Sequence, residues 1–499
     1  MAVDRLRSLV GAEERMDQSE APLVDAMRKY LEDDVAPFVI PAHKQGWALD
    51  SEMLDAIGRD TFRHDIGLLN GLDDIHESLE LQVRAQNLAA ELLGADHCYY
   101  LVDGSTLSVQ CAITAVAGPG EKLIVARNAH KSIPSGLIVG GIRPIFVAPG
   151  FDDQLDLSHG VDPEDVARAL EEHPDARGVV VVSPTYYGVA TDLAAIADAC
   201  HEHGVPLVAD DAWGGHFPFH PDLPAGALAS GADIAIGSFH KSLAGLQQAS
   251  ILSVQGDLVD PTIVDYRIGL VETSSVSSLI LGSMDATRRA LALRGEEMLG
   301  RTLALARRAR EEVAAIPGLS LLGREVVGRR GAYDLDETKL VVDVSALGMS
   351  GYDACDWLRT EHRVLVELAD HRRVLAVVTL ADDERSVERL VAALEALAAR
   401  GSAEARQPGM PRSSELQTEL VMRPRDAYFA PAEHVGLDEA VGRIVAEKVT
   451  PYPPGVPVLV PGERVTEPLV EYLRAGVAMG MNVTDVADSQ LETIRVVAE

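Results

Sequence analysis

The chain has 499 residues, of which 47% are apolar and 24% charged, and its 77 acidic and 44 basic side chains give a formal net charge of −33. At about 100–200 residues per domain, this length and composition predict roughly three folded domains and not a disordered chain. A surface this negative repels phosphate backbones and anionic lipids, which argues against nucleic-acid and membrane-surface partners.

The sequence contains no apolar run near the ~18–20 residues of a membrane-spanning helix. The first twenty residues are charged throughout, so no signal peptide is expected, and a cytoplasmic location follows as the expectation. The cysteines are widely spaced and form no CxxC pair, so neither a metal site nor a disulfide framework is expected. They are Cys98, Cys111, Cys200 and Cys355.

In chain order, residues 1–40 are charged and helical in pattern, with Leu23, Met27 and Leu31 on one face. Strand and helix patterns then alternate for about 200 residues, which predicts a parallel, doubly wound sheet. The expected strands are 98–102, 122–126, 143–148, 178–183, 206–210 and 233–238. The expected helices are 79–94, a helix from the loop at 103–106 to about residue 117, 162–173 and 192–204.

The pattern changes after the sheet region. One long helix is expected over 286–316, followed by strands at 339–347, 363–369 and 373–380 and a helix at 386–400. A Gly-, Pro- and Ser-rich stretch then predicts a linker. The expected organisation is an N-terminal helical segment (1–40), a large domain (41–285), a small α+β domain (286–400), a linker (401–414) and a C-terminal domain (415–499).

The strongest chemical signal is GSFHKS at 237–242, which follows an apolar strand. It places Ser238, His240 and Lys241 at the carboxyl end of that strand, the end that faces the ligand crevice in open α/β sheets. A desolvated lysine there can form a Schiff base, and the serine and histidine can hydrogen bond a phosphate. Taken alone, a surface lysine at a strand end is the commoner explanation.

A second strand, 206–210, ends in Asp210, one strand–helix–strand step before Lys241. A pyridoxal phosphate site needs this pair, a lysine for the aldehyde and a carboxylate that keeps the pyridine nitrogen protonated. The alternative for Asp210 is a helix N-cap. The adjacent Asp211 is expected to be solvated or bonded to backbone.

Two further segments follow strands. Gly-Ser-Thr at 104–106 opens a helix, where backbone N–H groups and the hydroxyls of Ser105 and Thr106 can hold a phosphate, although the same triplet also serves as an ordinary cap. His130 could lie on a cofactor ring or transfer a proton, with a core or surface histidine as the alternative. Lys131 is the rival Schiff-base candidate.

Together these motifs resemble those of the bacterial ornithine, lysine and arginine decarboxylases. The matching segments are PAHKQG (41–46), GLDDIHES (71–78), NLAAELLGADHCYYLVDGST (87–106), RNAHKSI (127–133), SPTYYGVATDL (183–193), GSFHKSLAGLQQASIL (237–252), ETSSVSSLILGSMDATR (272–288) and EAVGRIVAEKVTPYPPGVPVLVPGE (439–463). The chain departs from the family pattern at Ala42, Phe239 and Val276, where glycine, threonine and proline are usual, and HDIGLLNG (64–71) lacks the usual D-x-T-E.

The resemblance implies an α/β protein of pyridoxal phosphate fold type I. Its large domain would hold a mostly parallel, doubly wound sheet, beside a small α+β domain and a C-terminal α+β module. The implied reaction is α-decarboxylation of lysine, ornithine or arginine, in the context of polyamine biosynthesis. The chain resembles the short members, which lack an N-terminal response-regulator-like wing.

The resemblance also implies residue roles. Lys241 would bind the cofactor, Asp210 would pair with the pyridine nitrogen, His130 would stack on the ring and Ala212 would pack beneath it. The residues implied at the phosphate are Ser105, Thr106, Ser238 and His240.

Two expectations concern the substrate and the assembly. Glu463 would meet the distal amine of the substrate; the alternatives are that it caps a helix starting near Thr466 or pairs with Arg464. In this family Thr-Ser-Ser (273–275) reaches the neighbouring subunit's phosphate, so a homodimer or higher homo-oligomer is expected. Another fold type I enzyme, an aminotransferase, oxidase or lyase, and a regulatory paralogue remain the alternatives.

Overall fold

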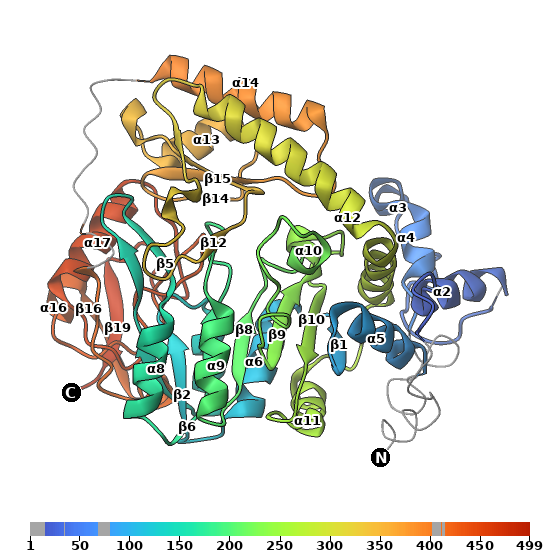
Figure 1. Cartoon of the computed structure of the whole chain (residues 1–499), viewed down its shortest axis with the longest axis horizontal. Helices are drawn as coiled ribbons and strands as arrows, with labels where there is room; N and C mark the ends of the chain where they lie inside the picture. Colours follow the sequence, from blue (N-terminus) through green and yellow to red (C-terminus); the bar gives the residue numbers. More distant parts are fainter. Residues whose placement is uncertain (1–14, 34, 68–79, 402–410, 412–414) are drawn as a thin grey trace.

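The computed structural model describes residues 15–33, 35–67, 80–401, 411 and 415–499. The expected motif at 71–78 and most of the expected linker at 401–414 lie outside these residues. Figure 1 shows a sheet region, a smaller layer above it and a C-terminal region beside both.

The main sheet has the order β1-β10-β9-β8-β6-β2-β3. Neighbours from β9 to β3 pair in parallel, whereas β10 is antiparallel to both β9 and β1. The mostly parallel sheet that the sequence predicts is therefore confirmed, and β10 is a strand that the sequence patterns missed. The strands are β1 (His97–Leu101), β2 (Lys122–Ala126), β3 (Arg143–Val147), β6 (Ala176–Val182), β8 (Leu207–Asp210), β9 (Ile234–Ser238) and β10 (Ser250–Val254).

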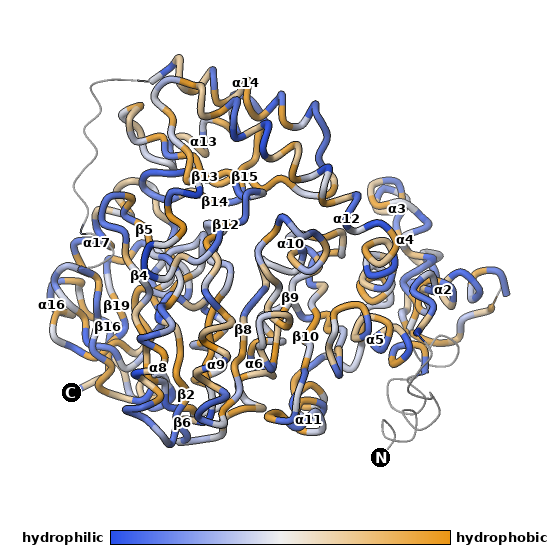
Figure 2. The backbone as a smooth tube through the Cα atoms, viewed as in Figure 1, coloured by the Kyte–Doolittle hydropathy of each residue, from blue (hydrophilic) through white to orange (hydrophobic). Residues whose placement is uncertain are grey.

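Helices cover both faces of this sheet because its strands are apolar on both sides. In β2, Leu123 and Val125 pack against α6 (Gly104–Val116) and α7 (Ser132–Gly140), whereas Ile124 and Ala126 face the core shared with α8 (Pro163–Glu172) and α9 (Leu193–Glu202). Figure 1 shows α8 and α9 in front of the sheet, and Figure 2 shows that the central strands are mainly hydrophobic. The remaining helices of this region are α5 (Glu80–Leu93), α10 (Phe239–Ser242) and α11 (Pro261–Val271).

A single helix, α12 (Ser278–Ala314), leads from the sheet region to the small domain. It starts where the Ser277 side chain accepts a hydrogen bond from the amide of Ile280, and it is kinked at Arg294. The small sheet, β11-β13-β15-β14, packs against α12, α13 (Gly351–Glu361) and α14 (Glu384–Arg400). Its strands are β11 (Ser320–Leu321), β13 (Lys339–Asp343), β14 (Leu368–Ala369) and β15 (Arg373–Val377). The last three are shorter than the patterns predict, and β11 is a strand that the patterns missed.

The two domains also share a ribbon in which β7 (Val189–Ala190) pairs with β12 (Asp334–Leu335). A hairpin of β4 (Pro149–Asp152) and β5 (Leu157–Val161) follows β3. Near the N-terminus, Leu23 and Met27 of α2 (Pro22–Glu32) are buried, as the helical pattern predicts, and α3 (Ser51–Ile57) and α4 (Arg59–His64) follow.

The C-terminal region has its own apolar core. Its elements are α15 (Pro424–Phe429), β16 (Ala432–Gly436), α16 (Leu437–Ala440), β17 (Thr450–Pro451), α17 (Glu467–Ala478), β18 (Val483–Thr484) and β19 (Thr493–Val497). The exact domain boundaries stay predictions. Among the described helices, none has both the length and the apolar character needed to cross a membrane.

Candidate active site

Asp210 and Lys241 come together at the carboxyl edge of the main sheet. Asp210 is the buried last residue of β8, and Lys241 lies in α10, directly after β9. Burial lowers the pKa of the Lys241 amine, and the charges of Asp210 and Glu367 oppose that shift. Burial raises the pKa of Asp210, opposed by Lys241 and by the Ala212 amide, whose nitrogen lies 3.3 Å from Oδ1.

This geometry excludes the alternative role that the sequence left open for each of these two residues. Lys241 is not a free surface lysine, because its Nζ lies 4.7 Å from the ring centroid of Trp213. Asp210 is not a helix N-cap, because the residues after it form turns. The neighbouring Asp211 is buried and not solvated, and the Ala227 amide donates to it.

A cluster of hydroxyls surrounds the first turn of α6. Ser105 Oγ lies 2.6 Å from Ser238 Oγ and 2.9 Å from Ser250 Oγ, and Ser250 Oγ lies 2.8 Å from Ser108 Oγ. Gly104 has a φ of +74°, which lets the chain turn sharply into the helix. Hydroxyls beside the free N–H groups of a helix start match the needs of a phosphate.

The other residues implied at the phosphate lie around this cluster. Thr106 is exposed in the first turn of α6. His240 Nδ1 lies 2.9 Å from the carbonyl oxygen of Ala249, and burial lowers its pKa. Phe239, where the family usually has threonine, points into the core and meets Tyr100 edge-to-face.

His130 is a neutral imidazole in this environment. Burial, followed by the charges of Lys241, Lys131 and Lys448, lowers its pKa to about 3. The Ser132 amide donates to Nδ1 at 3.3 Å, so the ring proton lies on Nε2. The C-terminal region touches this ring, because a Cβ added to Gly455 would lie 3.1 Å from His130 Cδ2.

The rival lysine is engaged elsewhere. Lys131 Nζ lies 3.4 Å from Asp485 and 4.9 Å from the ring centroid of Tyr452, both in the C-terminal region. Its amide also donates to the Gly455 carbonyl. Lys131 therefore ties the C-terminal region to the sheet edge.

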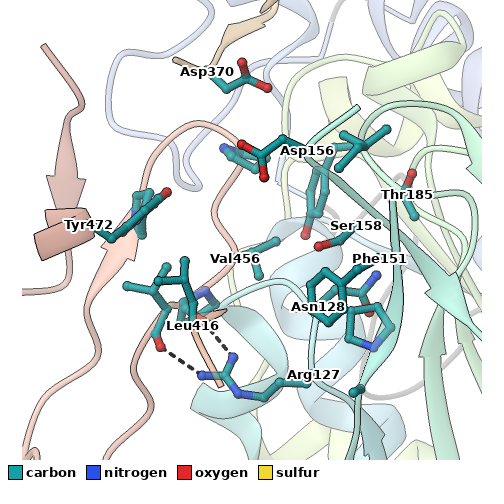
Figure 3. Close-up of a pocket in the computed structure, with 18 of the residues that line it drawn as sticks. Arg127, Asn128, Phe151, Asp156, Ser158, Thr185, Asp370, Leu416, Val456 and Tyr472 are labelled. Carbon is teal, nitrogen blue, oxygen red and sulfur yellow. Dashed lines mark hydrogen bonds between the residues drawn. The ribbon is translucent and has the colours of Figure 1, made fainter. Parts of the chain in front are cut away.

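A cavity of about 360 Å³ opens between the sheet edge, the small domain and the C-terminal region. In Figure 3, Arg127 lies at one end and Asp370 at the other, with Thr185 on the side of the sheet. The Tyr186 ring also lines it, and the charge of Asp210 is among the causes that raise the pKa of that phenol, after burial. Asp210, Lys241 and His130 do not line the cavity, but the Ser183 amide, two residues before Thr185, donates to the Asp210 carbonyl at 3.1 Å, so the cavity wall continues to the Asp210 end of the site.

Glu463 also lines this cavity, and it is buried. Its carboxylate accepts two hydrogen bonds from Arg127, at 2.9 and 2.8 Å, and one from the Val460 amide at 2.7 Å. Arg464 instead donates to the Gly442 carbonyl and lies 3.8 Å from Glu419. The substrate role of Glu463 stays a prediction.

Sequence reasoning missed several residues of this region. Ser250 was within reach, because it is the last polar residue of the segment 237–252 that resembles the family. Tyr186 was within reach for the same reason, because it lies in the segment 183–193. Trp213 and Lys339 lie outside the resembling segments, and aromatic and strand residues are usually core. Only their position around Lys241 and Asp210 marks them.

The residues fit pyridoxal phosphate. A desolvated amine can bind its aldehyde. Asp210 accepts a hydrogen bond from the Ala212 amide on Oδ1, and it forms no ion pair within the described part of the chain, so its carboxylate can also meet a pyridine nitrogen. The hydroxyl cluster at the α6 start can hold the phosphate. Such a site on this sheet defines a pyridoxal phosphate-dependent enzyme of fold type I.

Comparison with known proteins gives the family. The family model described as "Orn/Lys/Arg decarboxylase, major domain" matches residues 21–386, and "Orn/Lys/Arg decarboxylase, C-terminal domain" matches residues 409–482. The chain belongs to the Orn/Lys/Arg decarboxylase family, as its motifs predict, and its cofactor is pyridoxal phosphate.

Individual relatives agree with this assignment. The chain is 40% identical to an arginine decarboxylase of Halalkalibacterium halodurans, over 97% of this chain and 98% of that protein. It is 39% identical to an arginine decarboxylase of Bacillus subtilis, over 97% and 99% of the two chains. The crystal structure of a Francisella novicida lysine decarboxylase superposes with a TM-score of 0.81 at 18% identity, covering 96% of this chain and 81% of that one, which shows the shared fold.

Proposed function

We propose that this enzyme decarboxylates L-arginine at the α-carbon. The bond between Cα and the carboxylate breaks, carbon dioxide leaves, and a proton takes its place to give the corresponding amine. The observation that carries this choice of substrate is the 40% identity, over nearly the full length of both chains, to an arginine decarboxylase. Two lysine decarboxylases match over 91% of this chain at 22% identity.

The cofactor, when bound, supplies an electron sink for the bond that breaks. Lys241 would hold it covalently, because burial favours the uncharged amine that attacks an aldehyde. Asp210 would hold a proton on the pyridine nitrogen. Ser105, Ser238 and the α6 start would bind the phosphate, with Thr106 and His240 beside them, and Ala212 would pack beneath the ring.

His130 would lie on the cofactor ring as a neutral, Nε2-protonated imidazole. Because the His130 imidazole is neutral, it adds no positive charge beside the cofactor ring and does not oppose protonation of the pyridine nitrogen. The proton that replaces carbon dioxide would come from the Lys241 ammonium, because His130 is neutral here and would have to become an imidazolate to give up its Nε2 proton.

We also propose that the functional unit is a homodimer or a larger homo-oligomer. The described chain leaves large apolar side chains exposed, including Tyr266 and Leu270 on α11 and Phe38 and Trp47 near the N-terminus. Contact with a second copy would cover such surface. Thr273, whose amide donates to Asp103 Oδ2 at 3.1 Å, lies beside the loop that enters α6, where a partner's site could be reached.

The expected setting is the cytoplasm, where free arginine and pyridoxal phosphate occur. The amine product is of the kind from which polyamines are made, so a role in polyamine biosynthesis is part of the proposal.

One end-point assay tests the substrate. The purified, cofactor-loaded enzyme is given L-arginine, L-lysine or L-ornithine at equal concentration, and both amine and carbon dioxide are measured. We expect the highest kcat/KM with arginine. A higher value with lysine or ornithine would overturn the choice of arginine, and a keto acid in place of carbon dioxide would overturn decarboxylation itself.

A further inference from the structure

A buried ion pair lies where the small domain meets the large one. Lys339 Nζ is 2.7 Å from Asp336 Oδ2, and both side chains are fully buried. His216 Nε2 lies 3.2 Å from the same oxygen. Burial alone would raise the pKa of Asp336, but Lys339 and His216 outweigh it and hold that pKa below its ordinary value.

The backbone around this pair leaves little freedom to the lysine. The Asp336 amide donates to the Gly188 carbonyl at 2.8 Å, and a Cβ added to Gly188 would lie 2.9 Å from Lys339 Cγ. The lysine stem therefore passes close against the loop that follows β6. The Lys339 ammonium is therefore held in one orientation by the packing of its stem and by its ion pair with Asp336.

Trp213 connects this pair to the active-site lysine. The Lys339 Nζ lies 5.3 Å from the centroid of the Trp213 ring, and the Lys241 Nζ lies 4.7 Å from the same centroid. The two nitrogens are therefore within about 10 Å of each other, roughly one Debye length, and water screens charges little in a buried site. Each amine feels the charge of the other.

The two amines respond differently because only one has a carboxylate in contact. Lys339 Nζ donates a hydrogen bond to Asp336 Oδ2 at 2.7 Å, so a carboxylate lies against its charge. Lys241 forms no ion pair within the described residues, and the nearby charge of Lys339 is one of the causes that lower its pKa.

Other groups face Lys241 as well. Asp210 and Glu367 favour its charged form. His130 and His240 both have a lowered pKa and add no opposing charge at neutral pH. Burial is the main cause that lowers the pKa of Lys241, and the charge of Lys339 adds to burial against the two carboxylates.

We propose that Lys339 is a positioning residue of the active site: fixed by Asp336, its buried ammonium opposes that of Lys241 around the Trp213 ring and keeps the Lys241 amine ready to bind an aldehyde. The inference rests on the proposed role of Lys241 but not on the choice of arginine as substrate. Nothing in the chemistry of decarboxylation itself requires a second lysine here.

The test reads the protonation of Lys241 without any substrate. Full-length protein freed of cofactor is labelled with a trace of acetic anhydride across pH 6–11, and the acetylated Lys241 peptide is quantified by mass spectrometry. In Lys339→Met we expect the midpoint of labelling to rise by about one pH unit, a roughly tenfold smaller uncharged fraction below the midpoint. Capture of added pyridoxal phosphate at pH 7 should slow by a similar factor.

Three variants complete the design. Lys339→Arg retains the charge and should restore most of the wild-type midpoint. Lys339→Met with Asp336→Asn leaves no unpaired buried carboxylate, so it should fold even if the single variant does not, and its midpoint should also rise. Lys122→Met removes a surface lysine paired with Asp175 and should change nothing.

An unchanged Lys241 midpoint in the folded double variant would overturn the proposal. Because no substrate is present, failure of arginine decarboxylation and failure of this inference are separate results.

Discussion

Arg127 and Glu463, which lie 336 residues apart, form a two-point ion pair that joins the loop after β2 to the C-terminal region. Arg127 also donates to the carbonyl oxygens of Pro457 and Val458, at 2.7 and 3.1 Å. The same loop carries His130, whose ring lies against Gly455 of the C-terminal region. The C-terminal region is thus part of the active-site wall and not an appendage.

Glu463→Gln tests whether this pair is purely structural. Removing one partner of a fully buried pair costs about 3–5 kcal/mol, and less is expected here because the Arg127 side chain is 20% exposed. We expect a lower thermal unfolding midpoint. If Glu463 also meets the distal cation of the substrate, KM should rise far more for arginine than for citrulline, a neutral analogue of equal length. Equal changes for the two would limit Glu463 to holding Arg127.

Lys241 should be the residue that binds the cofactor covalently. Reduction of the cofactor-loaded enzyme with borohydride, followed by peptide mapping, is expected to place the label on Lys241, because burial lowers the pKa of its amine. Lys131 serves as the internal control, since it is held by Asp485. Label on Lys131 would exclude the assignment.

Asp210→Asn should fold and still bind cofactor but lose about 10²-fold or more in kcat, the usual loss when a preorganised electrostatic partner is removed. Asp211→Asn is the matched control. Burial and the charge of Asp210 raise the pKa of Asp211 well above its ordinary value, so the amide imitates its neutral form. Equal rates in the two variants, at full cofactor occupancy, would contradict the role of Asp210.

Ser105→Ala should weaken cofactor binding. A hydrogen bond to a charged group contributes about 1.5–3 kcal/mol, which corresponds to about a 10- to 100-fold rise in Kd for pyridoxal phosphate. Ser108→Ala removes a hydroxyl of the same serine cluster, one turn further along α6, and should have a smaller effect. A fluorescence titration of the cofactor-free variants decides between them, and equal Kd values would remove Ser105 from the phosphate site.

Glu272 should make stability depend on pH. Burial raises its pKa to about 7, with Asp103 adding to the shift and the Val102 amide opposing it. Because the folded pKa lies above the unfolded one, the stabilisation is present at low pH and is lost as pH rises through about 7. Thermal unfolding scans from pH 5 to 8 should show a smaller decline in Glu272→Gln than in wild type. Glu52→Gln, an exposed change on α3, should match wild type.

Much of the site follows from local sequence, and the rest does not, for a physical reason. Asp210, Ser238 and Lys241 could be predicted because parallel strands bring their carboxyl ends to one edge. β10 was missed because an antiparallel strand interrupts the strand–helix alternation. The partner of Glu463 and the place of Lys339 beside Trp213 arise from packing between distant segments, for which a single sequence holds no periodic signal.

The ribbon of β7 and β12 has a mechanical consequence for the cavity. The Thr185 amide donates to the Val189 carbonyl, so the loop that lines the cavity is closed onto the strand that pairs with β12. A rotation of the small domain about the kink at Arg294 must either break this ribbon or pull that loop along. If the ribbon stays intact, a change in the orientation of the small domain therefore moves the cavity wall at Thr185 and changes the width of the cavity.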